Sequence, residues 1–569
     1  MALRACAALL ALGLQGCSDG TGSSSAPGGI RGASGTGPTL TITGAPTDGV
    51  PAGTTVQLGA VVRDGSGKPQ SRKVGWTSRD PSRASVSDAG LVTALLPGAA
   101  RIVATSSGSL ADSVTLTIVV PVASVTVSPA TAYLYAGTDL QLTATLRDAA
   151  GNVLTGRKVA WTSLDAAKAS VDSVGKVTAL AAGTVQVRAS AEGKTADASL
   201  TIFARPVPDW SQATDWGTAQ GNAKHSGYYP ATLDPVVFAE AWTHTVASGV
   251  VLNPPALGGG RVYVSTNAYF GRQLLSVLDA GTGGEAWSRD FGAIHGVHPP
   301  AYADGSVYVT TSGHEDSFLW GLDAADGTLR FRSPYQNQWS RYLAPTVVGQ
   351  TVYMAGGYYG GMYAFGTDGA QRWFYATNQY DEWTPAVADG LVYAYTGDYS
   401  PRLSVADAAT GATVYEIPDP DFDWNGWSMG IAPALGEAGD LLATQAGRLV
   451  KFDLAGRRIE WQLRGTFTGN VVVAEGTLYV FAQGQVEARR ESDGALLWTW
   501  VLEDGQQPRT AIATRNLLLV STTAHTYAID LAARRAVWSY PAGGHLALGK
   551  DGILAIARPD GKVTAIRVK

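Results

Sequence analysis

The amino-acid sequence predicts an all-β protein in which two β-sandwiches are followed by an eight-bladed β-propeller. Two internal repeats carry this prediction: one of about 85 residues that occurs twice before residue 204, and one of 35 to 49 residues that fills the last 365 residues. Composition agrees, since 69 glycines and 27 prolines among 569 residues supply many turns. A chain of this length is expected to contain several domains.

The charge pattern limits the kinds of partner that the chain is expected to bind. The chain carries a net charge of -5, and only 16% of its residues are charged. No Lys/Arg cluster stands out along the sequence, so there is no basic surface of the kind that nucleic-acid binding requires. Nucleic acid is therefore not expected as a partner.

Residues 1–17 have the pattern of a signal peptide. Arg4 precedes the apolar run ACAALLALGL, which is too short to cross a bilayer as a stable helix. The run ends in LQGCS, which resembles the lipobox of bacterial lipoproteins. This resemblance implies lipidation of Cys17, and Ser18 after it implies the outer membrane, with the protein facing either the periplasm or the cell surface. Ordinary secretion with cleavage nearby is the alternative.

Two modules follow a tether. Residues 18–38 are nearly all Gly, Ser, Ala, Thr and Pro, a composition that predicts a flexible linker. KVGWTSRDPSRASVSDAGLVTALLPG, at 73–98, then returns as KVAWTSLDAAKASVDSVGKVTALAAG at 158–183. Short alternating strands, frequent turns and one buried tryptophan (Trp76, Trp161) are typical of a sandwich. Both copies resemble the bacterial Ig-like group 2 domain, which implies spacer or adhesive modules at residues 39–120 and 121–204.

Residues 205–569 contain the longer repeat, which predicts propeller blades of four short strands. An aromatic residue marks the outermost strand of each unit: Trp242, Trp287, Phe331, Trp373, Tyr415, Trp461, Trp498 and Trp538.

Proline marks the other side of each predicted blade. It recurs just before the middle strand, at Pro255, Pro300, Pro345, Pro385 and Pro433. Because proline is tolerated only at a sheet edge, this segment is predicted to be the innermost strand, which lines the channel. The last unit lacks its aromatic strand and the segment around Trp242 lacks a blade. We therefore expect both ends to build the eighth blade together, with seven blades as the alternative.

The turns between strands identify a family resemblance. LDAGTGGEAW, LDAADGTLRF and ADAATGATVY, together with the opening segment DWGTAQGNAKHSGYY at 215–229, resemble the repeats of pyrroloquinoline-quinone-type propellers. That family includes quinoprotein dehydrogenases, which hold a calcium-bound quinone. It also includes the non-catalytic lipoprotein subunit of the outer-membrane β-barrel assembly machinery. The propeller has no cysteine and no Glu, Asn and Asp set that matches the dehydrogenases, so the second branch is favoured.

A ligand-binding face is predicted on the loops of the first four blades. These loops are longer than those of the second half and combine aromatics with Asp, Asn and Gln, which suits a protein or polysaccharide ligand. The alternative is that the aromatics cover the blades and pack on one another. The candidate ligand-binding residues are Trp339, Tyr358, Tyr359, Trp383, Tyr399, Trp424 and Trp427.

One loop on this face also has the spacing of a metal site. Asp419, Asp421 and Asp423 stand at alternate positions, as side chains do at the start of a calcium loop. Trp424 then occupies the place of the usual turn glycine, and no bidentate Glu follows. The candidate metal ligands are these three acids, and a solvated acidic loop is the favoured alternative. No other cofactor is predicted.

The sequence therefore predicts a non-catalytic, lipid-anchored protein of the bacterial cell envelope, with the propeller as a binding or scaffold module. A quinoprotein-like oxidoreductase or another propeller enzyme is one alternative, although no convincing catalytic set is present. A surface adhesin is the other.

Overall fold

The computed structural model describes residues 37–107, 109–337, 341–358, 360–377, 383–397, 400–422, 430–445 and 447–569. Within these ranges the chain forms 52 β-strands and two short 3-10 helices, η1 (Ala219–Gly221) and η2 (Pro235–Val237), and no α-helix. The predicted all-β class is confirmed. The described residues contain no helix with the length and hydrophobicity that a membrane crossing requires.

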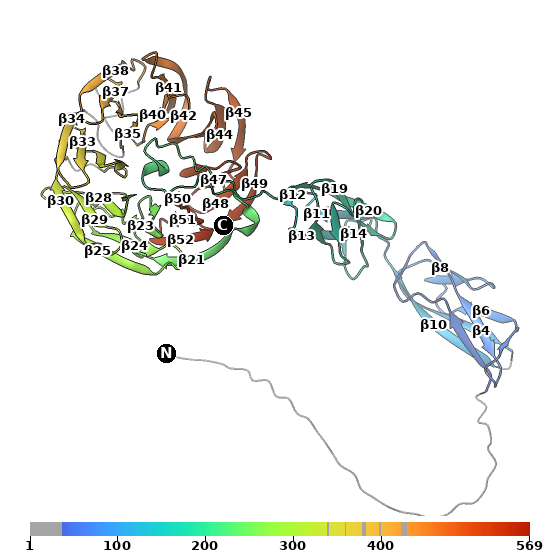
Figure 1. Cartoon of the computed structure of the whole chain (residues 1–569). Helices are drawn as coiled ribbons and strands as arrows, with labels where there is room; N and C mark the ends of the chain where they lie inside the picture. The colour runs from blue at the N-terminus through green and yellow to red at the C-terminus, as the bar shows by residue number, and fades with distance from the viewer. Residues whose placement is uncertain are drawn as a thin grey trace, which may run out of the picture. The chain divides into compact units, whose positions relative to one another are not determined.

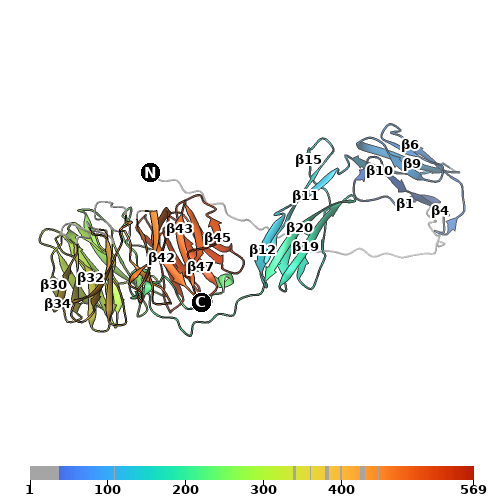
Figure 2. The ribbon, with the colours of Figure 1, turned by 90° about the horizontal axis from the view of Figure 1, so that it is seen from above.

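The two sequence repeats form two sandwiches with the same strand order (Figure 2). The first is built from the sheets β1 (Thr39–Thr43), β4 (Gly59–Arg63), β5 (Pro69–Gln70); β2 (Val50–Pro51), β10 (Leu110–Val119), β9 (Gly98–Ser106), β6 (Val74–Ser78); and β3 (Thr55–Gln57), β8 (Leu91–Ala94), β7 (Ala84–Val86). The second is built from β11 (Ser124–Ser128), β14 (Thr143–Arg147), β15 (Val153–Leu154); β12 (Thr131–Tyr135), β20 (Lys194–Phe203), β19 (Gly183–Ala191), β16 (Ala160–Ser163); and β13 (Asp139–Gln141), β18 (Lys176–Ala179), β17 (Ala169–Val171).

Equivalent residues pack inside each of the two sandwiches. Trp76 and Trp161 are half-buried, less than the sequence predicted, and each covers a glycine in a turn. Gly90 and Gly175 have φ near +80°, and a Cβ there would lie about 3 Å from the tryptophan ring. Residue contacts divide the chain into two compact units, and this division passes through the second sandwich rather than between the repeats. The boundaries at residues 120 and 204 therefore stay predictions.

The remaining strands form the propeller, which Figure 1 shows face on. Three four-stranded sheets and one five-stranded sheet follow one another in the order β22 (Ala256–Gly258), β23 (Arg261–Ser265), β24 (Arg272–Asp279), β25 (Glu285–Ala293); β26 (Gly296–Val297) and β27 (Ala301–Ala303), β28 (Ser306–Ser312), β29 (Phe318–Asp323), β30 (Leu329–Pro334); β31 (Thr346–Val348), β32 (Thr351–Ala355), β33 (Gly361–Gly366), β34 (Gln371–Ala376); and β35 (Ala386–Ala388), β36 (Leu391–Thr396), β37 (Arg402–Asp407), β38 (Thr413–Pro418).

Three further sheets complete the ring. They are β39 (Ala434–Leu435), β40 (Leu441–Gln445), β41 (Gly447–Asp453), β42 (Arg458–Ala474), β43 (Thr477–Ala482), β44 (Gln485–Arg490), β45 (Leu496–Val501); β46 (Thr510–Ala513), β47 (Leu517–Ser521), β48 (Thr526–Asp530), β49 (Arg535–Tyr540); and β21 (Ala239–Thr245), β52 (Lys562–Arg567), β51 (Ile553–Ala557), β50 (His545–Leu548). The seven-stranded sheet arises because β42 pairs with β41 through its first half and with β43 through its second. The count of eight blades depends on dividing β42 between two blades.

The ring closes where the sequence predicted. β21 pairs antiparallel with β52, so one sheet contains both ends of the propeller. The proline-led strands β22, β31, β35 and β39 are edge strands, as expected of strands that line the channel.

The repeated aromatic and the turn glycine hold neighbouring blades together. Trp242 Nε1 donates a hydrogen bond to the Ala280 carbonyl of the following sheet, at 2.9 Å, and Trp287 Nε1 donates one to Ala324, at 3.1 Å. The glycine of each turn, such as Gly283 with φ +72°, leaves room for the ring, since a Cβ there would lie 2.4 Å from Trp242. The aromatic and the glycine that recur in the sequence therefore mark the contacts between neighbouring blades.

Candidate functional site

A belt formed by residues 216–231 lies across the inner strands of the propeller, within the ring of sheets in Figure 1. Its backbone forms hydrogen bonds with residues of successive sheets as it runs. The amides of these inner-strand residues donate to belt carbonyls: Leu257 to Trp216, Tyr302 to Gly217, Val387 to Ala223, Leu435 to Lys224, Val473 to Ser226 and Ala513 to Gly227. Arg515, in the turn after β46, donates to Ala231. The opening segment at 215–229 thus runs along the inner strands and connects the blades through backbone hydrogen bonds.

The belt contains a buried histidine with a structural role. His225 is fully buried and adopts φ +55°. Its Nδ1 lies 3.2 Å from the Pro433 carbonyl and its Nε2 lies 2.9 Å from Thr346 Oγ1. Burial lowers the pKa of His225 to about 4, so the ring is neutral at physiological pH. It joins two inner strands and has no access to a substrate.

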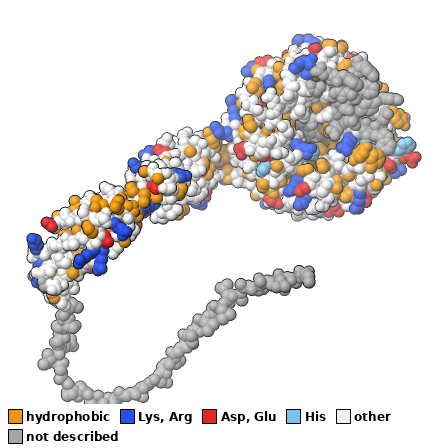
Figure 3. Space-filling model, turned by 180° about the vertical axis from the view of Figure 1, so that it is seen from behind, with side chains coloured by type: hydrophobic (Ala, Val, Ile, Leu, Met, Phe, Trp, Pro, Cys, Tyr) orange, Lys and Arg blue, Asp and Glu red, His pale blue; other side chains and the backbone are white. Residues whose placement is uncertain are grey.

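Above the belt, the channel encloses a cavity of about 200 Å³. Its wall is mainly apolar, with Trp216 and Gln220 of the belt on one side and Arg509 and His545 among the lining residues. Burial and the charge of Arg509 lower the pKa of His545 to about 4. Seen from the side opposite to Figure 1, the propeller is hollowed at its centre, with Lys and Arg side chains beside the hollow (Figure 3).

This cavity does not suit the calcium-bound quinone of the dehydrogenase branch. Calcium requires several oxygen ligands, commonly carboxylates. The described residues that line the cavity include no Asp or Glu, and the described part of the chain contains no cluster of three His, Cys, Asp or Glu residues that could bind a metal. The described lining residues offer proline rings and one cation, Arg509, where the cofactor would need anionic ligands.

The predicted loop face does present aromatic side chains to solvent. Tyr269 is 65% exposed, Phe270 52% and Tyr358 55%. Tyr269 and Phe270 stack edge-on at 4.7 Å, and both pack against His295, at 5.2 and 5.4 Å. The Arg341 guanidinium lies 5.8 Å from the Tyr269 ring centre.

Three predicted loops meet around a cleft of about 610 Å³ on this face, here called the loop cleft. Its lining residues are Gly313, His314, Glu315, Ser317, Phe318, Pro334, Tyr335, Gln336, Asn337 and Tyr358. Ser317 Oγ donates to the Gly313 carbonyl at 2.8 Å and accepts a hydrogen bond from the Asn337 amide, which fixes two of the loops together. The Gly357 amide donates to the Gln336 carbonyl at 2.6 Å and positions the third. A rigid, open cleft with polar and aromatic walls suits ligand binding.

One predicted ligand-binding residue is placed elsewhere. Trp383 is only 1% exposed and belongs to the main hydrophobic core of blades two to five. The prediction that it offers a face to a ligand is wrong, because the ring packs inward between blades. Alternation of aromatic and acidic residues in ATNQYDEW does not reveal which side chain turns inward.

The acidic run is only partly described, and it contains an ion pair. Asp419 is fully buried, and both of its carboxylate oxygens lie 3.0 Å from Arg448 Nη2. Tyr395 donates a hydrogen bond to Asp419 Oδ2 at 2.5 Å, and burial followed by the Asp419 charge raises the Tyr395 pKa well above its usual value. Asp421 accepts a hydrogen bond from Gln462 at 2.6 Å. The calcium prediction is wrong for Asp419, since a guanidinium occupies the place of the cation.

Several predicted residues lie outside the described ranges: Cys17, Trp339, Tyr359, Tyr399, Asp423, Trp424 and Trp427. Tyr358 is thus the one predicted ligand-binding residue that the described structure places at an open cleft. Sequence reasoning did not select Tyr269 and Phe270, although the length of the TNAYFGRQ loop pointed to them. It also missed Arg509, because a single arginine after a proline carries no pattern.

Comparison with known proteins bears on the family. A family model described as outer membrane protein assembly factor BamB matches residues 232–373, 336–540 and 445–569, which together cover more than half of the chain. A model of the bacterial Ig-like domain (group 2) matches residues 41–118 and 121–202.

Individual relatives are more distant. Ice-binding protein 1 of Shewanella frigidimarina (strain NCIMB 400) is 33% identical over 141 residues, which are 24% of this chain and 16% of that protein. The chain thus spans about one sixth of the length of this curated relative. BamB from Moraxella catarrhalis is 17% identical, with 58% of this chain and 100% of that chain covered at a TM-score of 0.46.

Two further solved structures are similar at the same low level. The computationally designed Ika8 protein is 14% identical, with 57% and 98% covered at a TM-score of 0.45. A europium-containing methanol dehydrogenase is 12% identical, with 61% and 90% covered at 0.38. By the extent of the family-model match, the chain belongs to the family of the outer membrane protein assembly factor BamB.

Proposed function

We propose that this chain is a non-catalytic protein of the bacterial cell envelope whose propeller binds a protein partner through its loop face. The observation that supports this proposal most directly is the exposure of Tyr269, Phe270 and Tyr358 on loops of the first and third blades. Exposed aromatics on rigid loops commonly act as anchor residues in protein interfaces. Family membership supports a role at the outer membrane, and the LQGCS motif supports a lipid anchor on Cys17.

The structure of the propeller favours a scaffold over an enzyme. The belt ties the inner strands together, and the channel cavity lacks carboxylates among its described lining residues. Two buried histidines of the propeller make structural contacts: His225 lies between the Pro433 carbonyl and Thr346, and His298 Nδ1 lies 2.7 Å from Thr310 Oγ1. A ring whose blades are tied together in this way is suited to presenting a surface.

The loop face can be tested by quantitative binding. The full chain is immobilised, and detergent-solubilised envelope proteins are passed over it; the partner is then purified and its affinity measured. A Tyr269→Ser/Phe270→Ser/Tyr358→Ser variant should lose most of the affinity. The matched control is Leu496→Ser/Val501→Ser, because these two side chains are 50% and 64% exposed on the outer strand β45 of another blade. Equal affinity of the two variants would show that the loop face is not the interface.

The adhesin alternative differs in location. It requires exposure on the cell surface, whereas the proposed scaffold role is compatible with the periplasm. Protease treatment of intact cells separates the two, because only a surface-facing propeller is cleaved before the outer membrane is opened.

A further inference from the structure

Two arginines meet at the outer rim of the propeller, between the first and second blades. Arg289 lies on β25, and its guanidinium carbon is 4.6 Å from the centre of the Trp320 ring on β29. Arg332 lies on β30 directly opposite Trp320 in the strand register, at 5.3 Å from the same ring and 4.3 Å from Phe318. Two cations therefore share one aromatic surface.

The repeat shows that packing does not require a cation at this position. Arg289 stands two residues after the marker aromatic Trp287 of its blade. In the other repeats the equivalent residues are His244, Ser333, Tyr375, Ile417, Leu463, Trp500 and Tyr540. All of these are uncharged or, for His244, weakly basic. A half-buried arginine costs desolvation that these side chains avoid, so its presence calls for a function other than packing.

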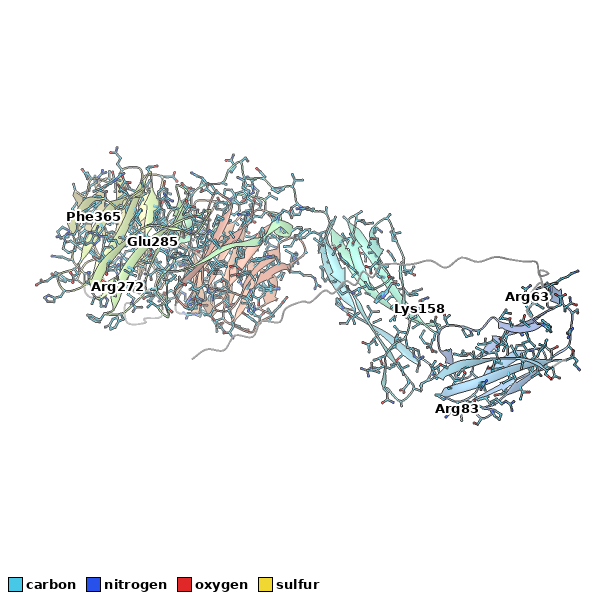
Figure 4. All side chains as sticks on the ribbon, turned by 90° about the horizontal axis from the view of Figure 1, so that it is seen from below. Arg63, Arg83, Lys158, Arg272, Glu285 and Phe365 are labelled. Carbon is cyan, nitrogen blue, oxygen red and sulfur yellow. The ribbon has the colours of Figure 1, made fainter. Side chains whose placement is uncertain are left out.

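Neither arginine forms an ion pair with another described residue. In the described part of the chain, no ion pair or side-chain hydrogen bond involves the guanidinium of Arg289 or Arg332. The nearest acid along the strand, Asp290, is bound to Arg272 at 2.7 Å (Figure 4 labels Arg272) and to the Gly292 amide at 2.8 Å. Burial and the charge of Arg332 lower the pKa of Arg289, which indicates that the two cations repel each other. An anion between them would relieve this repulsion.

A cleft is present at this place. It has a volume of about 190 Å³ and is lined by both arginines, by the acids Asp290 and Asp316, and by Phe291 and Trp320, among others. This rim cleft adjoins the loop cleft at Phe318, which lines both. Its volume exceeds that of a simple oxyanion and suits one monosaccharide unit.

The chemistry of the rim cleft selects among anions. Guanidinium groups bind carboxylates and phosphates through paired hydrogen bonds. Asp316 is exposed at the edge of the cleft and would repel a doubly charged phosphate, but its carboxylate can accept hydrogen bonds from hydroxyl groups. Aromatic edges from Phe291 and Phe318 offer contact to the C–H face of a sugar ring. One carboxylate with several hydroxyls fits this set of groups.

We propose that the rim cleft between Arg289 and Arg332 binds one uronic acid unit of an acidic polysaccharide. The two guanidinium groups take the sugar carboxylate, and Asp316 accepts hydrogen bonds from its hydroxyls. This site adjoins the loop face at Phe318, but its ligand is a sugar, so the proposal does not depend on the protein partner proposed above.

Isothermal titration of the full chain with trigalacturonate tests the proposal. Arg289→Leu places the residue of the equivalent position in another blade, Leu463, and Arg332→Gln removes the exposed cation. Each variant should bind at least tenfold more weakly than the unaltered chain. Arg457→Gln is the matched control, because Arg457 stacks on Tyr415 at the same 4.6 Å in a different blade, and its affinity should be unchanged.

Several binding results would overturn the proposal. Absence of trigalacturonate binding at millimolar concentration, or equal affinity in all three variants, would reject the site. Stronger binding of inorganic phosphate or of a glutamate-rich peptide than of trigalacturonate would reject the assignment to uronic acids. Neutral maltotriose should not bind, and equal binding of it would also reject the role of the arginines.

Thermal unfolding separates binding from packing. Without ligand, Arg289→Leu should raise the melting temperature, since it removes a half-buried charge that faces another cation. Trigalacturonate should raise the melting temperature of the unaltered chain but not that of the variant. A lower melting temperature for Arg289→Leu would show that Arg289 is a packing residue and overturn the proposal. Should that variant fail to fold, the exposed Arg332→Gln decides the question by its affinity.

Discussion

Replacing Asp419 with asparagine should strongly destabilise the sheets around β37, β38 and β41. The side chain of Arg448 is 3% exposed and that of Asp419 is fully buried, so the pair is desolvated on both sides. Asparagine keeps the shape but leaves the guanidinium without a counter-charge. Arg448 Nε already lacks a hydrogen-bond partner among the described residues, so the remaining contacts cannot compensate. Breaking a buried ion pair in this way costs about 3–5 kcal/mol.

Hydrogen exchange measured by mass spectrometry follows this loss locally. Peptides covering residues 402–418 and 441–453 should exchange roughly two to four orders of magnitude faster, because each 1.4 kcal/mol corresponds to about tenfold in the opening equilibrium. Asp421→Asn is the control, since Asp421 is exposed and, among the described residues, its side chain accepts a hydrogen bond from Gln462; the effect of this change should stay below about 1 kcal/mol. Asp419→Leu combined with Arg448→Met should recover most of the protection.

Two results would refute this reasoning. Unchanged exchange in Asp419→Asn would mean that the ion pair does not contribute to local stability. A rise in melting temperature with millimolar calcium that Asp419→Asn abolishes would mean that the carboxylate binds a cation instead of Arg448.

Three other expectations concern single residues. His225→Asn should flatten the pH dependence of stability, since asparagine tolerates the left-handed backbone. Because folding lowers the His225 pKa from 6.5 to about 4, the stability that is present above pH 6.5 decreases by about 3 kcal/mol as the pH falls towards 4. A variant whose melting temperature depends on pH as that of the unaltered chain does would contradict this. Trp383→Ala should cost about 3–5 kcal/mol in unfolding experiments without weakening partner binding by the folded protein; a selective loss of affinity at unchanged stability would restore the ligand-binding role. Cys17→Ser should move the protein from the membrane fraction to the soluble fraction after cell disruption, and retention in the membrane would argue against lipidation.

The framework of the propeller could be predicted because its signals are local and repeated. Proline before the inner strands lacks an amide donor, which places these strands at a sheet edge. The marker aromatics recur because each makes the same kind of contact with the neighbouring blade. The unpaired units at the two ends predicted that β21 would pair with β52, as it does. Each of these inferences depends on residues within one repeat, or on the strands that the first and last repeats lack.

The site could be predicted only in part, because its chemistry depends on residues far apart in the sequence. Asp419 resembled a calcium ligand by spacing, but its partner Arg448 follows 29 residues later on β41. Trp383 was expected at the surface, but its direction is set by the neighbouring blades. Arg289 is not marked by its own repeat, because its proximity to Arg332 depends on the packing of two blades.

Closure of the ring has a consequence for how the protein is made. Thr243 of β21 contacts Thr564 of β52, 321 residues later in the chain. During folding the first strand must therefore wait for the last, and the belt must hold its conformation while the inner strands arrive one after another. Contacts of such long sequence range form slowly, and the waiting strands present open edges that favour aggregation. A chain that stops short of residue 562 cannot complete the sheet that joins the ends of the propeller, so a late truncation is expected to be as damaging to folding as an early one.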